Sequence, residues 1–197
     1  RQLQALRGTV GKPKANVLAE RLRLINPQAT IRAVPLFYEA RTSDMLLFGK
    51  QKPDFVVDAI DNVRNKVLLI AECCRRGIPV ITSGAAGGRL DGTRVQVADL
   101  AKSVQDPLLS KVRAALRKEH GFPRAGKKMG IPCVFSPEPP VFPKADGTVC
   151  ASRSEAGEQA GSMKLNCEGG FGAATHVTGA FGFAAAGEVV RRLAAGN

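Results

Sequence analysis

Two acidic residues after an apolar run are the side chains of this chain that are best placed for chemistry. Residues 55–58 are typical of a buried strand that ends on Asp58, and Asp61 follows just before a helix-like segment. Ligands of open parallel α/β sheets bind beyond the carboxyl ends of the strands, where a carboxylate can hold a metal ion or a nucleotide. Asp61 is therefore a candidate residue for an active site, where it could hold a metal ion or a nucleotide.

The same residues also have a structural interpretation. An Asp or Asn after a strand often caps the next helix, and either Asp61 or Asn62 could cap a helix that begins at residue 63. Asp58 could instead be the cap, or it could bind a ribose hydroxyl. Local periodicity does not separate these roles, so both interpretations stay open.

Basic residues near the start of the chain could supply the other half of a nucleotide site. Arg1 and Lys14 are separated by Gly8 and Gly11, which allow tight backbone turns. Phosphoryl and adenylyl transfer require positive charge around nonbridging oxygens, which Arg, Lys and a metal-holding Asp provide without reacting themselves. The alternative for Lys14 is an ordinary solvated lysine at a helix start.

The net charge of +12 indicates a polyanionic partner, although solubility alone could explain it. Residues 111–128 contain seven basic residues and one acidic residue, which amounts to half of this excess. A solvated helix face is the alternative explanation, but the loop that follows is suited to gripping phosphates. The candidate RNA-binding residues are Lys111, Arg113, Arg117, Lys118, Arg124, Lys127 and Lys128.

The five cysteines include no Cys-x-x-Cys pair, which indicates free thiols in a reducing compartment. Zinc sites need close ligand pairs, so we expect no zinc. Cys167 precedes a Gly-rich turn and a helix, whose dipole would lower a thiol pKa; it is a candidate reactive thiol, with an inert structural role as the alternative.

The Gly-rich run 83–88 lacks a P-loop Lys and is interpreted as a close-approach turn beneath a ligand.

Periodicity and turn residues predict an α/β fold with a doubly wound, mostly parallel sheet, because helices and strands alternate along the chain. The length and the hydrophobic content of 44% favour a single domain over residues 1–197. Residues 144–162 are predicted to form a mobile loop, and the apolar C-terminal segment a packed helix rather than a membrane span. Helices are predicted at 14–25, 43–48, 63–76, 107–120 and within 170–195, and strands at 30–37, 55–58, 78–82, 93–97 and 132–136.

Several motifs, taken in chain order, resemble those of the ubiquitin-activating-like (HesA–MoeB–ThiF) adenylating superfamily. They are Arg1-Gln2, VG at 10–11 with Lys14, NP at 26–27, DAIDN at 58–62 and IPV at 78–80. Later motifs are similar to those of the tRNA threonylcarbamoyladenosine dehydratases, and the resemblance spans nearly the whole chain. These later motifs are QVADLAK at 96–102, QDPL at 105–108, CVFS at 133–136, DGTVC at 146–150 and GFGAAT at 170–175.

The resemblance implies a Rossmann-like sheet and an enzyme that uses ATP to cyclise threonylcarbamoyladenosine beside the tRNA anticodon. It also implies ATP contacts from Arg1, Gln2, Lys14, Asp61 and Asn62, with catalytic roles for the two basic residues and for Asp61, the latter through magnesium. One alternative is adenylation of the C-terminus of a ubiquitin-like sulfur-carrier protein. Another is a noncatalytic RNA-binding or scaffold protein. The basic segment 111–128 favours tRNA.

The start of the chain departs from the family pattern. Family members begin with a β-α unit that carries a Gly-rich nucleotide loop and an acidic ribose-binding residue, and this chain starts after both. We therefore expect an N-terminally truncated sheet, and residues 1–197 alone to be inactive and poorly stable. The resemblance further suggests a homodimer, a sulfur-transfer or redox partner protein, and a location in the bacterial cytoplasm or, in a eukaryote, in the mitochondrion or plastid.

Overall fold

The computed structural model describes residues 4–47, 52–144, 146–152 and 172–196. The chain divides into two compact units, Arg1–Lys52 and Pro53–Asn197. The single domain that composition favours stays a prediction.

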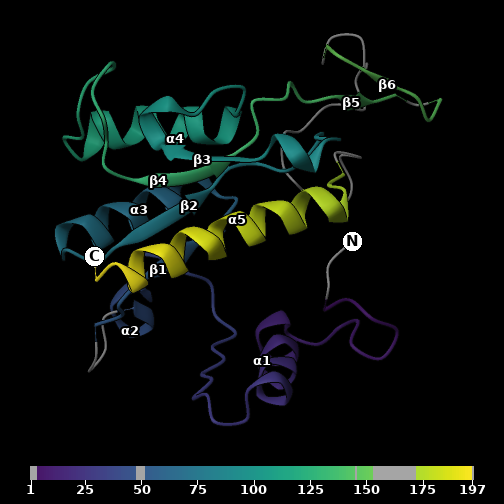
Figure 1. Ribbon diagram of the computed structural model, residues 1–197, viewed down its shortest axis with the longest axis vertical. Helices are drawn as coiled ribbons and strands as arrows, with labels where there is room; N and C mark the ends of the chain where they lie inside the picture. Colours follow the sequence, from purple (N-terminus) through teal and green to yellow (C-terminus); the bar gives the residue numbers. More distant parts are fainter. Residues whose placement is uncertain (1–3, 48–51, 145, 153–171, 197) are drawn as a thin grey trace. The chain divides into compact units, whose positions relative to one another are not determined.

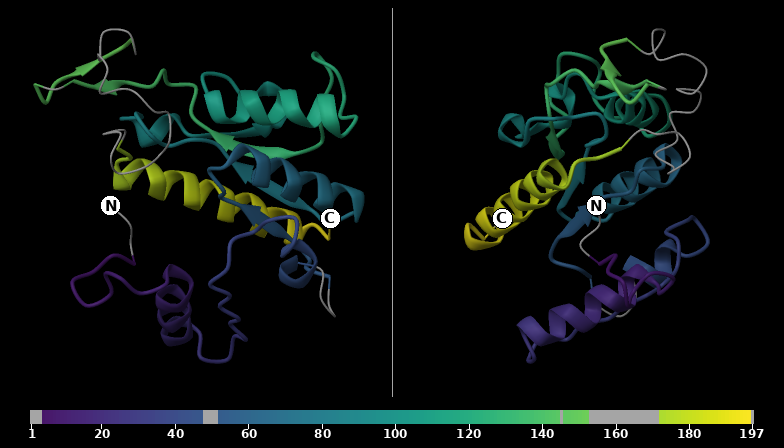
Figure 2. Two further views of the ribbon diagram at one scale, coloured as in Figure 1. Left: turned by 180° about the vertical axis from the view of Figure 1, so that it is seen from behind. Right: turned by 90° about the vertical axis from the view of Figure 1, so that its right-hand side faces the viewer.

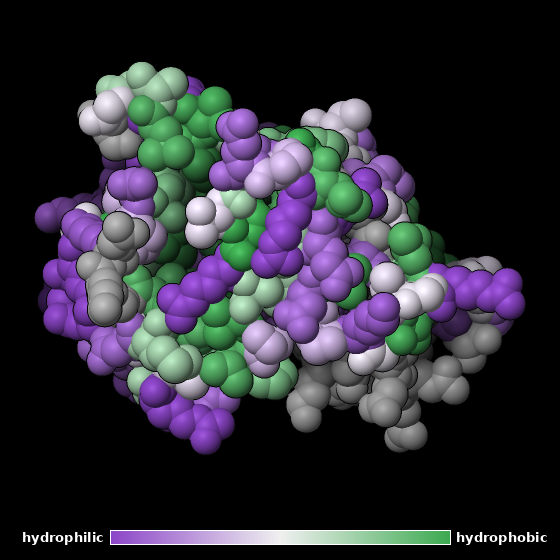
Figure 3. Space-filling model, turned by 90° about the horizontal axis from the view of Figure 1, so that it is seen from below, coloured by the Kyte–Doolittle hydropathy of each residue, from purple (hydrophilic) through white to green (hydrophobic). Residues whose placement is uncertain are grey.

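The unit Arg1–Lys52 contains two helices, α1 (Lys14–Ile25) and α2 (Ser43–Leu47), both predicted from the sequence. The cap of α1 at its carboxyl end is Asn26, whose backbone N–H donates to the carbonyl of Leu22. A proline follows Asn26 directly. Among the apolar residues of α1, Ala19 is buried but Ile25 is 70% exposed. The face drawn in Figure 3 likewise shows hydrophobic residues at the surface among hydrophilic ones.

The strand predicted at residues 30–37 is wrong, because this segment has no regular secondary structure. A strand is held by hydrogen bonds to a neighbouring strand more than by the propensity of its own residues. Among the described residues of this unit no strand is available for pairing.

The unit Pro53–Asn197 is built on a four-stranded sheet of order β1-β2-β4-β3 (Figure 1). The first three strands in that order are parallel, and β3 pairs with β4 in the antiparallel sense at the outer edge. The mostly parallel sheet predicted from the sequence is confirmed. The strands are β1 (Val56–Asp58), β2 (Val80–Ser83), β3 (Gln96–Asp99) and β4 (Pro132–Phe135).

Helices cover both faces of this sheet. Helices α3 (Val63–Arg75) and α4 (Pro107–Glu119) lie on one face, and α5 (Thr175–Ala194) lies on the other (Figure 2). Ile81 of β2 and Val134 of β4 belong to the same buried cluster as three residues of α5. Side chains alternate between the two faces along a strand, so the neighbours of Ile81 in β2 and of Val134 in β4 point to the other face, toward α3 and α4. This is the doubly wound arrangement.

Two regions differ in detail from the predicted elements. Residues 93–97, predicted as a strand, are divided between a 3-10 helix, η1 (Gly92–Arg94), and β3, because Asp91 accepts a hydrogen bond from the N–H of Thr93 and starts a helical turn. A second 3-10 helix, η2 (Leu100–Lys102), follows β3. Within the predicted loop 144–162, a short strand, β6 (Val149–Cys150), pairs with β5 (Phe142–Pro143), whereas residues 145 and 153–162 lie outside the described residues.

Among the described residues, no helix combines the length and the apolar character that crossing a bilayer requires.

Candidate active site

The parallel strands end at a common edge of the sheet, and a buried polar network joins two of these ends. Asp58, the last residue of β1, accepts a hydrogen bond from Nζ of Lys66 in α3, with 2.8 Å between Nζ and Oδ2. Thr82 of β2 donates to the same oxygen at 2.7 Å and accepts from Nζ at 3.0 Å. The side chains of Asp58 and Lys66 are both 0% exposed. The network therefore ties α3 to the ends of both strands.

This network decides the role of Asp58. Its second oxygen, Oδ1, accepts from the backbone N–H of Ile60 at 2.9 Å. The carboxylate is thus buried and accepts three hydrogen bonds, so Asp58 is neither a helix cap nor able to reach a ribose. Burial lowers the pKa of Lys66, and the attraction of Asp58 partly offsets this effect.

Asp61 stands free between two fixed residues. Before it, Ile60 is tied to Asp58; after it, Asn62 caps α3, accepting from the N–H of Asn65 at 3.1 Å. Asp61 itself is exposed, and its side chain forms no hydrogen bond with any described residue. The capping role therefore belongs to Asn62, and the carboxylate of Asp61 remains available for a ligand.

The surroundings of Asp61 fit a magnesium ion that is carried mainly by a nucleotide. The described residues hold no cluster of three or more His, Cys, Asp or Glu side chains that could bind a metal by themselves. Mg²⁺ is commonly bound through one or two carboxylates together with substrate phosphates. A single free carboxylate at the sheet edge meets that need.

The Gly-rich turn after β2 approaches another part of the same chain. A Cβ on Gly84 would lie 2.1 Å from Oδ2 of Asp106. That oxygen accepts from the N–H of Ala85 at 2.8 Å, while Oδ1 caps α4 by accepting from Leu109 at 2.9 Å. The turn after β2 does make a close approach, to Asp106; that it lies beneath a ligand stays a prediction. An Asp directly before Pro107 is the signal that could have revealed this cap.

Arg89, at the end of the same turn, is a buried cation that the sequence did not reveal. It is 2% exposed, and its Nη2 donates to the carbonyl of Gln105. Its Nε and Nη1 have no hydrogen-bond partner among the described residues. Burial lowers the pKa of Arg89, and its position just after a glycine pair is the only local signal for it.

Of the other predicted site residues, Lys14 is exposed at the start of α1. It belongs to the unit Arg1–Lys52 and Asp61 to the other unit, so a shared site of these two residues stays a prediction. Arg1, Gln2 and Cys167 lie outside the described residues.

The four described cysteines are free, as predicted. Burial raises the pKa of Cys73 and of Cys133 to about 12. These thiols therefore stay protonated near neutral pH and are poor nucleophiles.

The basic segment 111–128 contains two kinds of side chain. Arg113 donates to the carbonyl of Ser103 at 3.0 Å, and Arg117 donates to the carbonyl of Pro123 at 3.0 Å, so both help to hold the fold. The other five project from α4 or from the loop after it, and all five are exposed. They are Lys111, Lys118, Arg124, Lys127 and Lys128.

Comparisons with known proteins agree with this architecture. A model of the ThiF family matches residues 1–195. The tRNA threonylcarbamoyladenosine dehydratase of Escherichia coli is 44% identical over 196 residues, which cover 99% of this chain and 71% of that protein. The enzyme of the same name from Haemophilus influenzae is 46% identical over 196 residues, which cover 98% of this chain and 70% of that protein.

Solved structures show the same relationship. The structure described as TcdA (CsdL) superposes with a TM-score of 0.85 at 42% identity, over 99% of this chain and 71% of that one. The E. coli tRNA N6-threonylcarbamoyladenosine dehydratase in complex with ATP gives a TM-score of 0.81 at 39% identity, over 99% of this chain and 69% of that one. The chain therefore belongs to the ThiF family and, within it, to the tRNA threonylcarbamoyladenosine dehydratases.

Proposed function

We propose that this protein uses ATP to dehydrate threonylcarbamoyladenosine in tRNA to its cyclic form. The observation that carries this function is the 44% identity to a dehydratase of that name across 99% of the chain. The site agrees with it, because a free carboxylate follows a parallel strand at the edge where such sheets bind nucleotides. A related structure at 39% identity is described as a complex with ATP.

The reaction requires activation of a carboxylate. The threonine carboxylate of the modified nucleotide attacks the α-phosphorus of ATP, forming an acyl adenylate and releasing pyrophosphate. An amide nitrogen or oxygen of the same substituent then attacks the activated carbonyl and displaces AMP, so the nucleotide loses one water overall. Because negative charge develops on phosphate oxygens, the protein must chiefly supply positive charge and orientation.

Within this mechanism Asp61 would hold the metal ion that accompanies ATP, and magnesium there would neutralise charge on the phosphates. Asn62 keeps its side-chain NH₂ group for the nucleotide, because the cap of α3 uses only Oδ1. Lys14, Arg1 and Gln2 are proposed to contact the phosphates of ATP. The Asp58–Lys66–Thr82 network acts indirectly, since it fixes the loop from which Asp61 projects.

The test uses the protein produced from its complete gene, with ATP–pyrophosphate exchange as the readout. We expect exchange that depends on threonylcarbamoyladenosine-modified tRNA, and cyclic product detected by mass analysis of the nucleosides. Exchange that depends on a ubiquitin-like carrier protein would instead support sulfur-carrier adenylation. Tight tRNA binding without exchange would support a noncatalytic RNA-binding protein, and either result would contradict the proposal.

Asp61→Asn should lower kcat by about 100-fold or more, because a metal-held charge is worth several kcal/mol in the transition state. Asp54→Asn is the matched control. Asp54 is an exposed carboxylate that precedes the amino end of β1, whereas Asp61 follows the carboxyl end. The unfolding midpoints of both variants should match that of the wild type. Equal activity of the two variants would exclude Asp61 from the site.

The exposed part of the basic segment is proposed to contact tRNA phosphates. Replacing Lys127 and Lys128 together with Ala should weaken tRNA binding and reduce the slope of log K against log salt by up to about two. An unchanged slope would show that these two residues do not touch the RNA.

A homodimer is part of the same proposal, supported by exposed apolar side chains such as Ile25 and, in the other unit, Phe183. Light scattering of the purified protein measures this directly, and a monomer mass at micromolar concentration would contradict it. A sulfur-transfer or redox partner and a cytoplasmic, mitochondrial or plastid location stay predictions from the family resemblance.

A further inference from the structure

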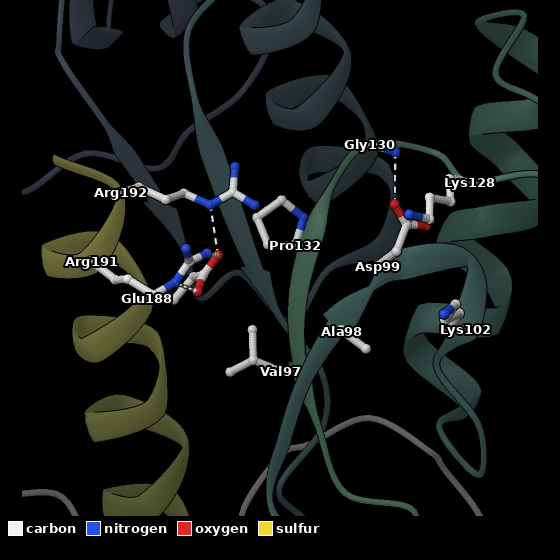
Figure 4. Close-up of a pocket in the computed structure, with 10 residues that line it drawn as sticks. All are labelled: Val97, Ala98, Asp99, Lys102, Lys128, Gly130, Pro132, Glu188, Arg191 and Arg192. Carbon is white, nitrogen blue, oxygen red and sulfur yellow. Dashed lines mark hydrogen bonds and ion pairs between the residues drawn. The ribbon is translucent and has the colours of Figure 1, made fainter. Parts of the chain in front are cut away.

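A basic groove lies at the other end of the sheet, away from Asp61. It has a volume of about 490 Å³ and is bounded by the C-terminal turns of α5 and by β3 with the chain segments around it; we call it the α5–β3 groove. Val97 of β3 and Pro132, the first residue of β4, lie between its flanks (Figure 4). Because Pro132 begins β4 and Asp99 ends the antiparallel β3, the groove is at the amino edge of the parallel strands.

The lining carries more positive than negative charge. Four cations and two carboxylates face the groove, and Figure 4 shows the cations on both flanks. One flank carries Lys102 and Lys128, and the other carries Arg191 and Arg192 of α5. The two lysines are exposed, and neither forms a hydrogen bond or an ion pair with a described residue.

The two carboxylates are already occupied. Asp99 accepts three backbone hydrogen bonds, from Ala101 at 2.9 Å, Met129 at 3.0 Å and Gly130 at 2.7 Å. It therefore holds together the segment that follows β3 and the segment that precedes β4, at one end of the β3–β4 pair. In the part of the chain that the structure describes, it forms no hydrogen bond or ion pair with Lys128, which lies beside it in Figure 4.

Glu188 is held between the two arginines of α5. Arg191 binds it through Nε at 3.0 Å and Nη2 at 2.8 Å, and Arg192 binds it through Nε alone at 2.6 Å. The terminal nitrogens of Arg192 thus have no partner among the described residues. A guanidinium with its outer edge free is a preferred donor for phosphate oxygens.

We propose that the α5–β3 groove binds a phosphodiester of the RNA backbone, with Lys102 and Lys128 on one side of the phosphate and Arg192 on the other. This inference rests on the proposed action on tRNA. Cations on two sides of an open groove, over a floor of apolar side chains, suit a phosphate with its attached sugar. A neutral or cationic ligand would leave these charges unpaired.

The distance to the active site suits a tRNA whose modified nucleotide lies near Asp61. Strand β4 separates the two edges and has four residues, so they are roughly 13 Å apart at about 3.3 Å per residue. Strand β1, which leads to Asp61, lies two strands from β4 in the sheet, so the groove and Asp61 are further apart than this and several nucleotides of an RNA strand would span them. The groove therefore adds a contact that orients the RNA without touching the reacting atoms.

The test compares two double variants in binding a labelled tRNA at 50 to 200 mM salt. Lys102→Ala/Arg192→Ala removes one cation from each flank of the groove. The matched control, Arg21→Ala/Arg32→Ala, removes two exposed cations from the unit Arg1–Lys52. At a slope of about 0.7 to 0.9 per phosphate contact, loss of this one contact should weaken binding about 5- to 8-fold at 0.1 M salt and make the slope smaller by about 0.7 to 0.9.

A gain of binding provides a second and independent readout. Glu188→Gln removes one negative charge from the groove and frees both arginines, so tRNA should bind roughly fivefold more tightly at 0.1 M salt. The affinity for ATP and the unfolding midpoint show whether each variant has folded. Both effects together support the groove as an RNA site.

The outcomes separate this inference from the proposed function. If the wild type binds tRNA and the groove variant behaves like the control, the groove is not an RNA site, although the dehydratase function stands. If the wild type does not bind tRNA at all, both are wrong. Weaker binding of the groove variant without a change in salt slope also contradicts a phosphate contact.

Discussion

At the carboxyl edge of the sheet, the side chains of Asp58, Lys66 and Thr82 are buried and hydrogen-bonded to one another. At the amino edge, Lys102 and Lys128 are exposed and form no ion pair with a described residue. Both edges carry charged side chains, but these differ in how they are stabilised and in what they can bind. Charges without water are stable only when they are paired and hydrogen-bonded, so the first edge is rigid. Exposed cations keep their hydration and can exchange it for a polyanion, so the second edge is suited to reversible binding.

Lys66→Met should have the largest effect on stability. It leaves the carboxylate of Asp58 buried without its cation, which typically costs 3–5 kcal/mol. Arg64→Met is the matched control, because Arg64 is an exposed cation on the same helix and its loss should change the free energy of unfolding by less than about 0.5 kcal/mol. Urea unfolding measures both. Similar costs for the two variants would show that burial does not distinguish the two kinds of charge.

Gly84→Ala should have the next largest effect. The new methyl would displace Asp106, which would lose its bond to Ala85 and its cap on α4, at roughly 1 kcal/mol each. Thermal or urea unfolding should therefore show a loss of about 2 kcal/mol.

Gly182→Ala is the control for that substitution. Gly182 lies in α5 with open space around its Cβ position, so the change should stabilise the protein by up to about 1 kcal/mol through helix propensity. Opposite signs for the two glycines would confirm that the turn after β2 is constrained by Asp106. A loss at both positions would point to a general intolerance of alanine instead.

Much of the fold could be predicted from the sequence, because periodicity reports which face of an element is buried. Helices α3 and α4, and the alternation of helices and strands that indicates a mostly parallel sheet, follow from such patterns. The segment 30–37 shows the limit, since its residues favour a strand but pairing requires a partner that local sequence cannot supply.

The site was predictable only in part, for a similar reason. Asp61 could be located because it follows a strand. The partnership of Lys66 with Thr82 could not, because the two residues meet only when α3 packs across β2. Of the groove cations only Lys128 was a predicted RNA-binding residue. Lys102 and Arg192 were missed, since they are far apart in sequence and are brought together by β3 pairing on β4 and by α5 packing on the sheet.

Substitution of Glu188, whose carboxylate lines the α5–β3 groove, should have the smallest effect on stability. Hydrogen bonds from Arg191 hold the pKa of Glu188 below its ordinary value of 4.5. A carboxyl group with a lowered folded pKa stabilises the protein fully above pH 4.5, and this contribution is lost as the pH falls through the folded pKa. For a pair at the surface it should amount to less than about 1 kcal/mol. In urea unfolding from pH 6 to pH 3, the difference between wild type and Glu188→Gln should therefore shrink below pH 4.5, and a constant difference would contradict the ion pairs. Because the same substitution is expected to tighten tRNA binding, a carboxylate that adds little to stability would set how much positive charge the groove offers to RNA.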